Sequence, residues 1–251
     1  MLAIVLPKAD DKVLSALTFQ KYKKFKVYLA TGEAEEYPSL NVRHGSWSQV
    51  EEPVLCILEP GAVPDRCFTF RVALAVWLHR KFDVYHVNVE GEKAFPRKAS
   101  AKKLFRLAVY QGVRTPLSSF VFRTEALRAH AIFKADGTLD VLPTVFSCLR
   151  ERPLRNVWKG KMQWEKPVPP QTEATIRERL ALFRWTEDYF GDDDYPLTVG
   201  DQLKFFADEL TKLTLPEEEL VKMMDSFLVS QGTLRRVRAR SALKNALKVK
   251  E

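Results

Sequence analysis

Cysteine, histidine and glycine are scarce in this chain of 251 residues, and each scarcity argues against a class of site. The three cysteines, Cys56, Cys67 and Cys148, form no CxxC pair, so neither a disulfide framework nor a cysteine zinc site is indicated. The four histidines form no metal-binding cluster. The ten glycines fall in no phosphate-loop, dinucleotide-binding or nucleophile-elbow motif. We therefore predict no catalytic residue, no metal and no cofactor.

Long apolar runs are also missing. No stretch approaches the roughly 18 apolar residues that a membrane-spanning helix needs, so we predict no membrane insertion. The apolar start, residues 1–6, stops at Pro7-Lys8 and is too short for a signal-peptide core. It is an apolar arm that packs either on its own core, as strand or helix, or on a neighbouring molecule.

Positive charge is present in excess, and it is concentrated. Residues 93–161 contain fifteen Lys or Arg against four Asp or Glu, a net charge of +11, whereas residues 162–230 carry −8 and residues 231–251 carry +6. Aromatic residues interrupt the basic ones throughout this block. Basic groups that neutralise phosphates, beside rings that stack on bases, suit a single-stranded nucleic-acid groove. A solvated basic face over an ordinary aromatic core is the alternative, and composition does not decide between them.

The hydrophobic pattern predicts a mainly α protein with a few short β-hairpins. Helical spacing begins at Val13, while Phe25–Ala30 fits either a strand or a helix end. Asp136-Gly137 is a hairpin signal. We expect a hairpin around 47–58, a mostly buried helix at 68–82, a strand or extended link at 84–89, and helices at 98–111, 172–189, 199–213, 216–230 and 233–250.

Two features leave an enzymatic alternative open. The acidic run Asp192–Asp194 could hold Mg²⁺, although an exposed turn is the simpler interpretation. Pro64-Asp65 followed by Glu90–Lys93 is similar to a nuclease motif, but Gly91 stands where the motif needs an acid. The alternatives to an RNA-binding protein are thus a nucleic-acid-processing enzyme with a diverged site, or a basic structural or scaffold protein.

Several segments, in order, resemble the nucleocapsid proteins of bunyaviruses, of the peribunyavirus and tospovirus types. The resemblance covers roughly residues 25–145. It rests on Phe25-Lys-Val-Tyr-Leu29, on Ser39-Leu-Asn-Val-Arg-His-Gly-Ser-Trp47, on Pro60-Gly61 with Val63-Pro-Asp65 and Phe68-Thr-Phe-Arg71, and on Lys103-Leu-Phe-Arg-Leu-Ala-Val-Tyr-Gln-Gly112.

This resemblance implies two mainly helical lobes with an RNA groove between them, and terminal arms that reach neighbouring protomers. The parts would be an N-terminal arm at 1–15, lobes at 16–116 and 117–231, and a C-terminal arm at 232–251. The protein would be no enzyme but a viral nucleoprotein that encapsidates single-stranded RNA without sequence specificity. It would form a ring or filament of identical copies, work with a viral polymerase, and occur in the virion and the host cytoplasm.

The same resemblance, together with the charge map, supplies candidate site residues. Those expected to bind RNA are Arg43, Trp47, Arg71, Arg80, Lys98, Lys102, Lys103, Arg106, Tyr110, Phe122, Arg123, Arg128 and Arg155. Those expected to mediate oligomerisation are Leu2, Ile4, Leu6, Leu234, Val237, Leu243 and Leu247.

Overall fold

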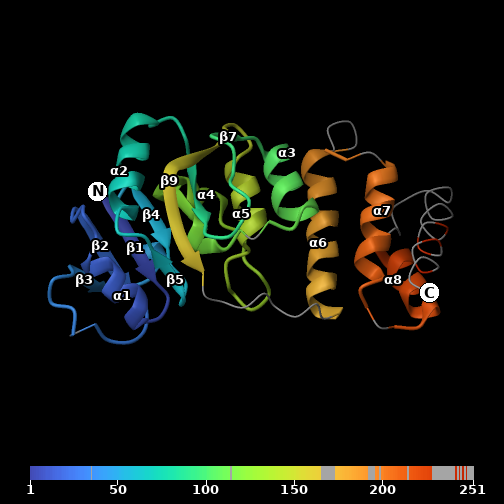
Figure 1. The fold of residues 1–251 in the computed structure, drawn as a ribbon, viewed down its shortest axis with the longest axis horizontal. Coiled ribbons are helices and arrows are strands. Elements are labelled where there is room, and N and C mark those ends of the chain that lie inside the picture. Colours follow the sequence, from blue (N-terminus) through green and yellow to red (C-terminus); the bar gives the residue numbers. More distant parts are fainter. Residues whose placement is uncertain are drawn as a thin grey trace. The chain divides into compact units, whose positions relative to one another are not determined.

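The computed structural model divides into two units, Met1–Lys166 and Pro167–Glu251, which are described separately. It describes residues 1–34, 36–113, 115–164, 173–191, 196–197, 199–213, 215–227 and positions 241, 243, 245 and 247. Within that part of the chain, the first unit holds a mixed β-sheet with helices, and the second unit is helical (Figure 1).

The sheet of the first unit has nine strands in the described residues, in the order β3-β2-β1-β4-β8-β6-β9-β5, with β7 paired to β9. Their bounds are β1 Leu2–Leu6, β2 Phe25–Leu29, β3 Val42–His44, β4 Val54–Ile57, β5 Ala62–Pro64, β6 Val84–Val89, β7 Lys98–Ala99, β8 Phe120–Arg123 and β9 Leu154–Trp164. The helices are α1 Asp11–Thr18, α2 Phe68–Leu78, α3 Ala101–Leu104, α4 Thr124–His130 and α5 Val141–Cys148. Two 3₁₀ turns are η1 Trp47–Gln49 and η3 Leu117–Ser119, and the π-helix η2 Phe105–Tyr110 continues α3 directly.

Strand β1 lies in the interior of this sheet. It pairs in parallel with β2 on one side and with β4 on the other, so that Ile4 is opposite both Val27 and Cys56. All five residues of β1 are buried. Leu2, Ile4 and Leu6 join one apolar cluster, and Ala3 and Val5 are buried on the other face. The apolar start of the chain is therefore a core strand and not an arm.

Helices α1 and α2 bury one side each in the same apolar cluster, through Val13, Leu14 and Leu17 of α1 and Phe68, Val72 and Ala75 of α2. The buried amide of Gln20 links the two helices. Its Nε2 donates to the Asp65 carbonyl at 2.8 Å, and its Oε1 accepts from the Thr69 backbone N–H at 3.0 Å. A buried amide is stable only when both ends are hydrogen-bonded, so Gln20 fixes where α2 begins.

The prediction of a mainly α fold with two helical lobes and terminal arms is wrong. Strands β1, β2 and β4 are buried on both faces, as parallel strands inside an α/β protein are, and so they give continuous apolar runs without alternation. The expected hairpin at 47–58 does not form, because β4 pairs with β1 and β8 instead. The expected lobe border at 116/117 falls inside the first unit.

Several local predictions are confirmed. Residues 84–89 form strand β6, and the Asp136-Gly137 turn closes a bridge between Phe133 and Leu139. The open question about residues 25–30 resolves as strand β2. In the second unit the predicted helices appear as α6 Glu173–Phe190, α7 Val199–Leu210 and α8 Glu217–Phe227.

The second unit packs around aromatic side chains. The ring of Phe183 on α6 stacks on Phe205 at 4.9 Å and contacts Phe206 at 4.7 Å, both on α7. Leu220 and Met224 of α8 are also buried. The acidic run at 192–194 lies outside the described residues.

The interior position of β1 predicts a large cost for truncating its side chains. We expect Ile4→Ala to lower the free energy of unfolding by roughly 2–5 kcal/mol, since it removes a fully buried side chain and leaves a cavity. Urea denaturation measures this decrease in the free energy of unfolding. Leu78→Ala, at a side chain that is mostly exposed, should change stability by no more than about 0.5 kcal/mol. Equal, small effects of both changes would mean that β1 is not a core strand.

Buried His86 predicts a pH-dependent stability. Burial lowers the pKa of this imidazole from 6.5 to about 3, because the charged form loses its hydration in the core, and the neighbouring Asn156 side chain offsets only part of this effect. Between those pH values the unfolded chain binds a proton that the folded chain excludes. Stability should therefore fall as pH falls below 6.5, by up to about 1.4 kcal/mol per pH unit.

Chemical denaturation of the wild type and His86→Gln across this pH range tests the sign and the source of the slope. The His86→Gln variant should lose the pH dependence of stability that comes from His86. Replacing the exposed His44 should leave that pH dependence unchanged. A slope unaltered in His86→Gln would assign the pH dependence to other groups.

Candidate functional site

The strand order reverses at β1. From β1 the chain builds outward through β2 and β3, and then returns to place β4 on the other side of β1. In open α/β sheets, ligands bind outside the carboxyl ends of the strands at such a reversal. The loops that follow β1, β2 and β4 therefore form the candidate site, and we call residues 7–10, 30–32 and 58–61 the crevice loops.

Asp10 joins two of the crevice loops across this reversal. One carboxylate oxygen accepts a hydrogen bond from the Val13 backbone N–H at 3.1 Å and so caps helix α1. The other accepts from the Gly61 backbone N–H at 3.0 Å, in the loop after β4. A short acceptor side chain at a helix N-cap is a local preference, but here it also sets the width of the crevice.

The loops after β1 and β2 are held together in the same way. The Thr31 hydroxyl donates to the Pro7 carbonyl at 2.9 Å, and the Ala9 N–H donates to the Thr31 carbonyl at 2.9 Å. Gly32 has a positive φ of 93°, and a Cβ there would stand 2.7 Å from that of Ala9. Glycine is needed at this position both for the backbone conformation and for the close approach.

Polar groups line the remaining side of the crevice. The Glu59 N–H donates to the hydroxyl oxygen of the buried Ser118 at 2.8 Å, and that hydroxyl lies 3.3 Å from Glu59 Oε2. The carboxylate of Glu59 is partly exposed at the end of β4, and Lys8 is exposed at the end of β1. The site thus offers a cation, a carboxylate acceptor and a serine around one reversal point.

The crevice does not provide the ligand set of a metal site. Both oxygens of Asp10 accept backbone hydrogen bonds, and Glu59 is the one other carboxylate of the crevice loops, which is fewer ligands than a metal site built from protein alone needs. Within the described ranges, no group of three or more His, Cys, Asp or Glu side chains is placed to hold a metal ion. Burial raises the pKa of the Cys56 thiol and raises that of Cys148 to about 12, so neither is an activated nucleophile.

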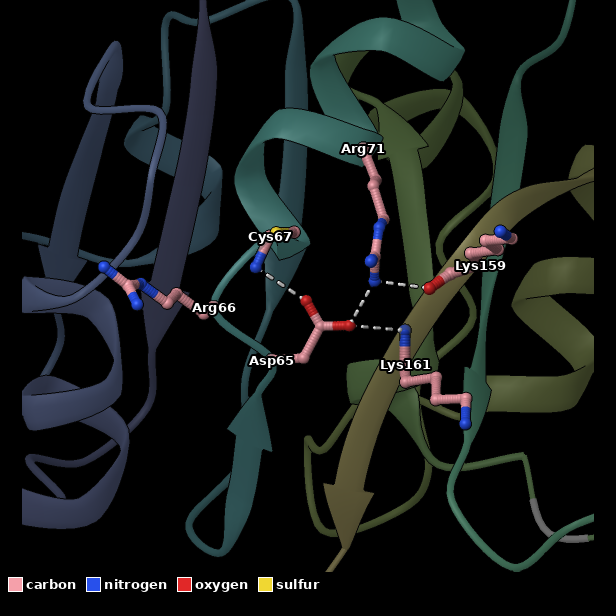
Figure 2. Close-up of a pocket in the computed structure, with 6 residues that line it drawn as sticks. All are labelled: Asp65, Arg66, Cys67, Arg71, Lys159 and Lys161. Atoms are coloured by element: carbon pink, nitrogen blue, oxygen red, sulfur yellow. Dashed lines mark hydrogen bonds and ion pairs between the residues drawn. The ribbon is translucent and has the colours of Figure 1, made fainter.

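A separate pocket of about 540 Å³ lies beside β5, α2 and β9, and Figure 2 shows its lining. Asp65 is at its centre. The Asp65 carboxylate accepts from the Cys67 N–H at 2.7 Å and the Lys161 N–H at 3.2 Å, and it pairs with Arg71 Nη1 at 2.5 Å. None of these residues belongs to the crevice loops, and the carboxylate is fully used in joining α2 to β9.

The residues predicted to bind RNA are distributed over many elements of the first unit. Arg43 is on β3, Trp47 on η1, Arg71 on α2, Arg80 just after α2, Lys98 on β7, Lys102 and Lys103 on α3, Arg106 and Tyr110 on η2, Phe122 and Arg123 on β8, Arg128 on α4, and Arg155 on β9. The structure brings Lys98 and Arg155 together over the ring of Phe82, at 5.8 and 5.9 Å.

Several of these side chains have structural partners. Phe122 is fully buried, so its ring is not available for stacking, and the Trp47 ring stacks on Phe133 at 6.1 Å. Arg128 Nη2 donates to the Val50 carbonyl at 2.6 Å, and Arg123 Nη2 donates to the Arg80 carbonyl at 2.9 Å. These guanidinium groups brace the chain.

The residues predicted to mediate oligomerisation are also placed differently where the structure describes them. Leu2, Ile4 and Leu6 belong to the buried strand β1, and Leu243 is buried in the second unit. Leu247 is partly buried. Leu234 and Val237 lie outside the described residues.

No family model and no curated protein matches the sequence, but solved structures match the fold. The N-terminal part of Staphylococcus aureus TarS, residues 1–349, in complex with UDP-GlcNAc matches with a TM-score of 0.64 at 12% identity, over 98% of this chain and 88% of that one. Its complex with UDP matches with a TM-score of 0.60 at 14% identity, again over 98% of this chain and 88% of that one. The mannosyltransferase PcManGT of Pyrobaculum calidifontis, in complex with GDP-Man and Mn²⁺, matches with a TM-score of 0.50 at 14% identity, over 98% and 85%.

The fold of this chain is therefore similar to the folds of these solved proteins. This finding overturns the resemblance to bunyavirus nucleoproteins, which rested on short segments that any basic, aromatic-rich chain can share. It also overturns the expected RNA-encapsidating function, the expectation of no enzymatic activity, and the RNA, viral polymerase and ring-forming partners. The alternative of a nucleic-acid-processing enzyme has no support either.

The structure also identifies crevice residues that the sequence patterns missed, namely Lys8, Asp10, Thr31, Glu59 and Ser118. Each is a polar residue within four positions of a strand end, which is a weak signal when taken alone. Their common place emerges only from the strand order, which brings the ends of β1, β2 and β4 side by side.

The double role of Asp10 predicts a graded response to substitution. Asp10→Ala loses the helix cap and the bond to Gly61, and we expect it to lower the free energy of unfolding by roughly 1–2 kcal/mol. Asp10→Asn keeps an acceptor for the helix cap but loses the second acceptor oxygen, so it should lower the free energy of unfolding by about half as much as Asp10→Ala does. Urea denaturation of both variants measures whether stability decreases from the wild type to Asp10→Asn to Asp10→Ala. An alanine variant as stable as the wild type would contradict the bridging role.

Proposed function

We propose that this protein is a glycosyltransferase that takes its sugar from a nucleoside-diphosphate donor bound in the crevice loops. The observation that carries the proposal is the match of nearly the whole chain to proteins solved in complex with UDP, UDP-GlcNAc and GDP-Man. The second support is the polar crevice at the reversal of strand order, where a ligand is expected in this class of sheet.

Each crevice group has a chemical role in this proposal. Lys8 follows β1 closely and supplies the positive charge that a diphosphate requires. The carboxylate of Glu59 accepts hydrogen bonds from hydroxyls of the nucleotide or the sugar, and Ser118 orients that carboxylate. Asp10 acts indirectly, because it holds the loop after β4 against the loop after β1.

The reaction that such a site performs is a substitution at the anomeric carbon. A hydroxyl of the acceptor forms the new bond to that carbon, and the bond from the carbon to the diphosphate oxygen breaks. The nucleoside diphosphate leaves with the electron pair, and the hydroxyl proton passes to a base. Charge that develops on the leaving diphosphate is the charge that Lys8 is placed to stabilise.

The matching mannosyltransferase was solved with Mn²⁺. In this chain both oxygens of Asp10 are engaged by the backbone, and Glu59 is the one other carboxylate of the crevice loops, so the residues present do not fit a site built from protein ligands alone. The roles assigned to Lys8 and Glu59 therefore rest on direct contacts with the donor, and that of Ser118 rests on its hydrogen bond to Glu59. Assays are run both with Mn²⁺ and with a chelator.

We expect the protein to release nucleoside diphosphate from at least one member of a panel of UDP- and GDP-sugars. A coupled assay for free UDP and GDP, beside calorimetric titration of the nucleotides themselves, measures turnover and binding. Lys8→Ala should weaken binding of the nucleoside diphosphate by about tenfold, while Lys8→Arg should retain most of it. Lys24→Ala, which removes an exposed lysine just before β2, is the matched control and should bind normally.

Failure of every tested nucleoside diphosphate to bind, with the chain folded, would overturn the proposed function. Binding that is equal in Lys8→Ala and the wild type would overturn the role of Lys8 alone.

A further inference from the structure

Helix α2 exposes an apolar stripe on its outer side. Its inner side packs in the core through Phe68, Val72 and Ala75. Its outer side carries Phe70, Leu74, Trp77 and Leu78, which are 50%, 37%, 62% and 55% exposed. The helix is therefore apolar nearly all round, which is typical of a buried helix, although it lies at the surface. The sequence predicts a mostly buried helix here, and these four positions are the exception.

Strand β9 exposes a tryptophan beside the same helix. Between the pairs His86–Asn156 and Asn88–Lys161, β6 advances by two residues while β9 advances by five, so β9 bulges. Trp158 lies in the bulge and is 69% exposed. Lys159 has a left-handed φ of 54°, and a Cβ on Gly160 would stand 2.9 Å from Val157 Cγ1. The bulge thus stores strain, a feature found preferentially at functional sites.

The bulge is braced against α2. Arg71 Nη1 donates to the Lys159 carbonyl and pairs with Asp65, which in turn accepts from the Lys161 N–H. A cavity of about 240 Å³ between the two elements is lined by Phe70, Leu74 and Leu78 on one side and by Arg155 and Trp158 on the other. Phe70, Leu74, Leu78 and Trp158 thus meet at one cavity, and Trp77 is exposed on the same outer side of α2. We call these five side chains the α2–β9 patch.

The surroundings of the α2–β9 patch are basic. They comprise Arg66, Arg80, Lys81, Arg155, Lys159 and Lys161, all on β9 or the turns beside α2. The acidic residues of these turns, Asp65 and Asp83, pair with Arg71 and Arg152. Figure 2 shows the side chains of Lys159 and Lys161 extending away from the Asp65 carboxylate, and Lys159 Nζ lies 4.7 Å from the centre of the Trp158 ring. The patch presents apolar rings within a positive field.

We propose that the α2–β9 patch docks the protein on an anionic lipid bilayer. Tryptophan, phenylalanine and leucine ringed by lysine and arginine match the membrane interface, where rings enter the head-group region and cations meet acidic head groups. The rings project from the outside of a helix and from a bulge, so they can enter a soft surface without a preformed partner cavity. In the described residues no helix is long and apolar enough to cross a membrane, so the contact proposed is with the surface.

Vesicle co-sedimentation of the full chain tests the proposal, with phosphatidylcholine vesicles that do or do not contain phosphatidylglycerol. We expect binding to the anionic vesicles that weakens with salt, accompanied by a blue shift of tryptophan fluorescence. Trp77→Ser with Trp158→Ser should lower the partition coefficient by at least about tenfold. Arg66→Ala with Lys161→Ala should lower it by about fivefold for each charge removed.

The chain offers a matched control for the tryptophan variant. Phe19 and Phe133 are 69% and 51% exposed and lie outside the patch, so Phe19→Ser with Phe133→Ser should bind vesicles like the wild type. Circular dichroism verifies that each variant is folded. The crevice residues are untouched in all of them, so nucleotide binding should be retained and reports separately on the proposed function.

Three results would overturn the docking proposal. One is the absence of binding to anionic vesicles at low salt by the folded wild type. Another is equal binding by the wild type and the Trp77/Trp158 variant. The third is a dimer in light scattering that dissociates when the two tryptophans are replaced, which would make the patch an interface between copies of this chain.

Discussion

The parallel pairing of β1 with both β2 and β4 is the constraint on which the first unit depends. Five residues satisfy backbone hydrogen bonds on two sides and bury side chains on two faces, so β1 fixes the position of its neighbours in every direction. The same pairing places three strand ends at one edge of the sheet. The crevice follows from it, because Lys8, Thr31 and Glu59 are merely the residues that come next.

A second set of contacts organises the other end of the strand order. Asp65 and Arg71 tie the start of α2 to β9, and Gln20 ties α1 to the same turn. The crevice and the α2–β9 patch are thus built from different residues but share helices α1 and α2 as supports. The proposed donor site and the proposed docking surface can coexist in such an arrangement because they use different side chains.

The sequence patterns predicted helices and strands that have one solvent-exposed face. The same patterns mostly failed to predict strands that are buried on both faces. Helices α7 and α8 show clear periodicity, and the Asp136-Gly137 turn has a specific backbone requirement. Strand β6 is an exception: it is buried on both faces, and it was predicted because His86 and Asn88 alternate with apolar residues. Strands β1 and β4 have no alternation to detect, since both of their faces are buried. The basic block misled for a related reason. Charge counting cannot show that a guanidinium is engaged by the chain, as that of Arg128 is by the Ser48 and Val50 carbonyls.

The crevice lay beyond sequence reasoning because it depends on strand order. Asp10 and Gly61 are 51 positions apart, and nothing local to either residue indicates that they meet. An N-cap preference explains half of what Asp10 does, and only the placement of β4 beside β1 explains the other half.

Strand β9 also has a consequence for how the chain acquires its fold. It pairs with β5, β6 and β7, which precede it by as many as about a hundred residues. These strands can therefore form their hydrogen bonds with β9 only after residues 154–164 have been synthesised. During synthesis, β6 emerges with one backbone edge unpaired, and an open edge is a template for pairing with other chains. The first unit thus combines slow, non-local closure with a period of exposure on the ribosome. A chain that ends before β9 would keep that edge permanently, so aggregation, rather than a smaller folded domain, is the outcome of losing β9.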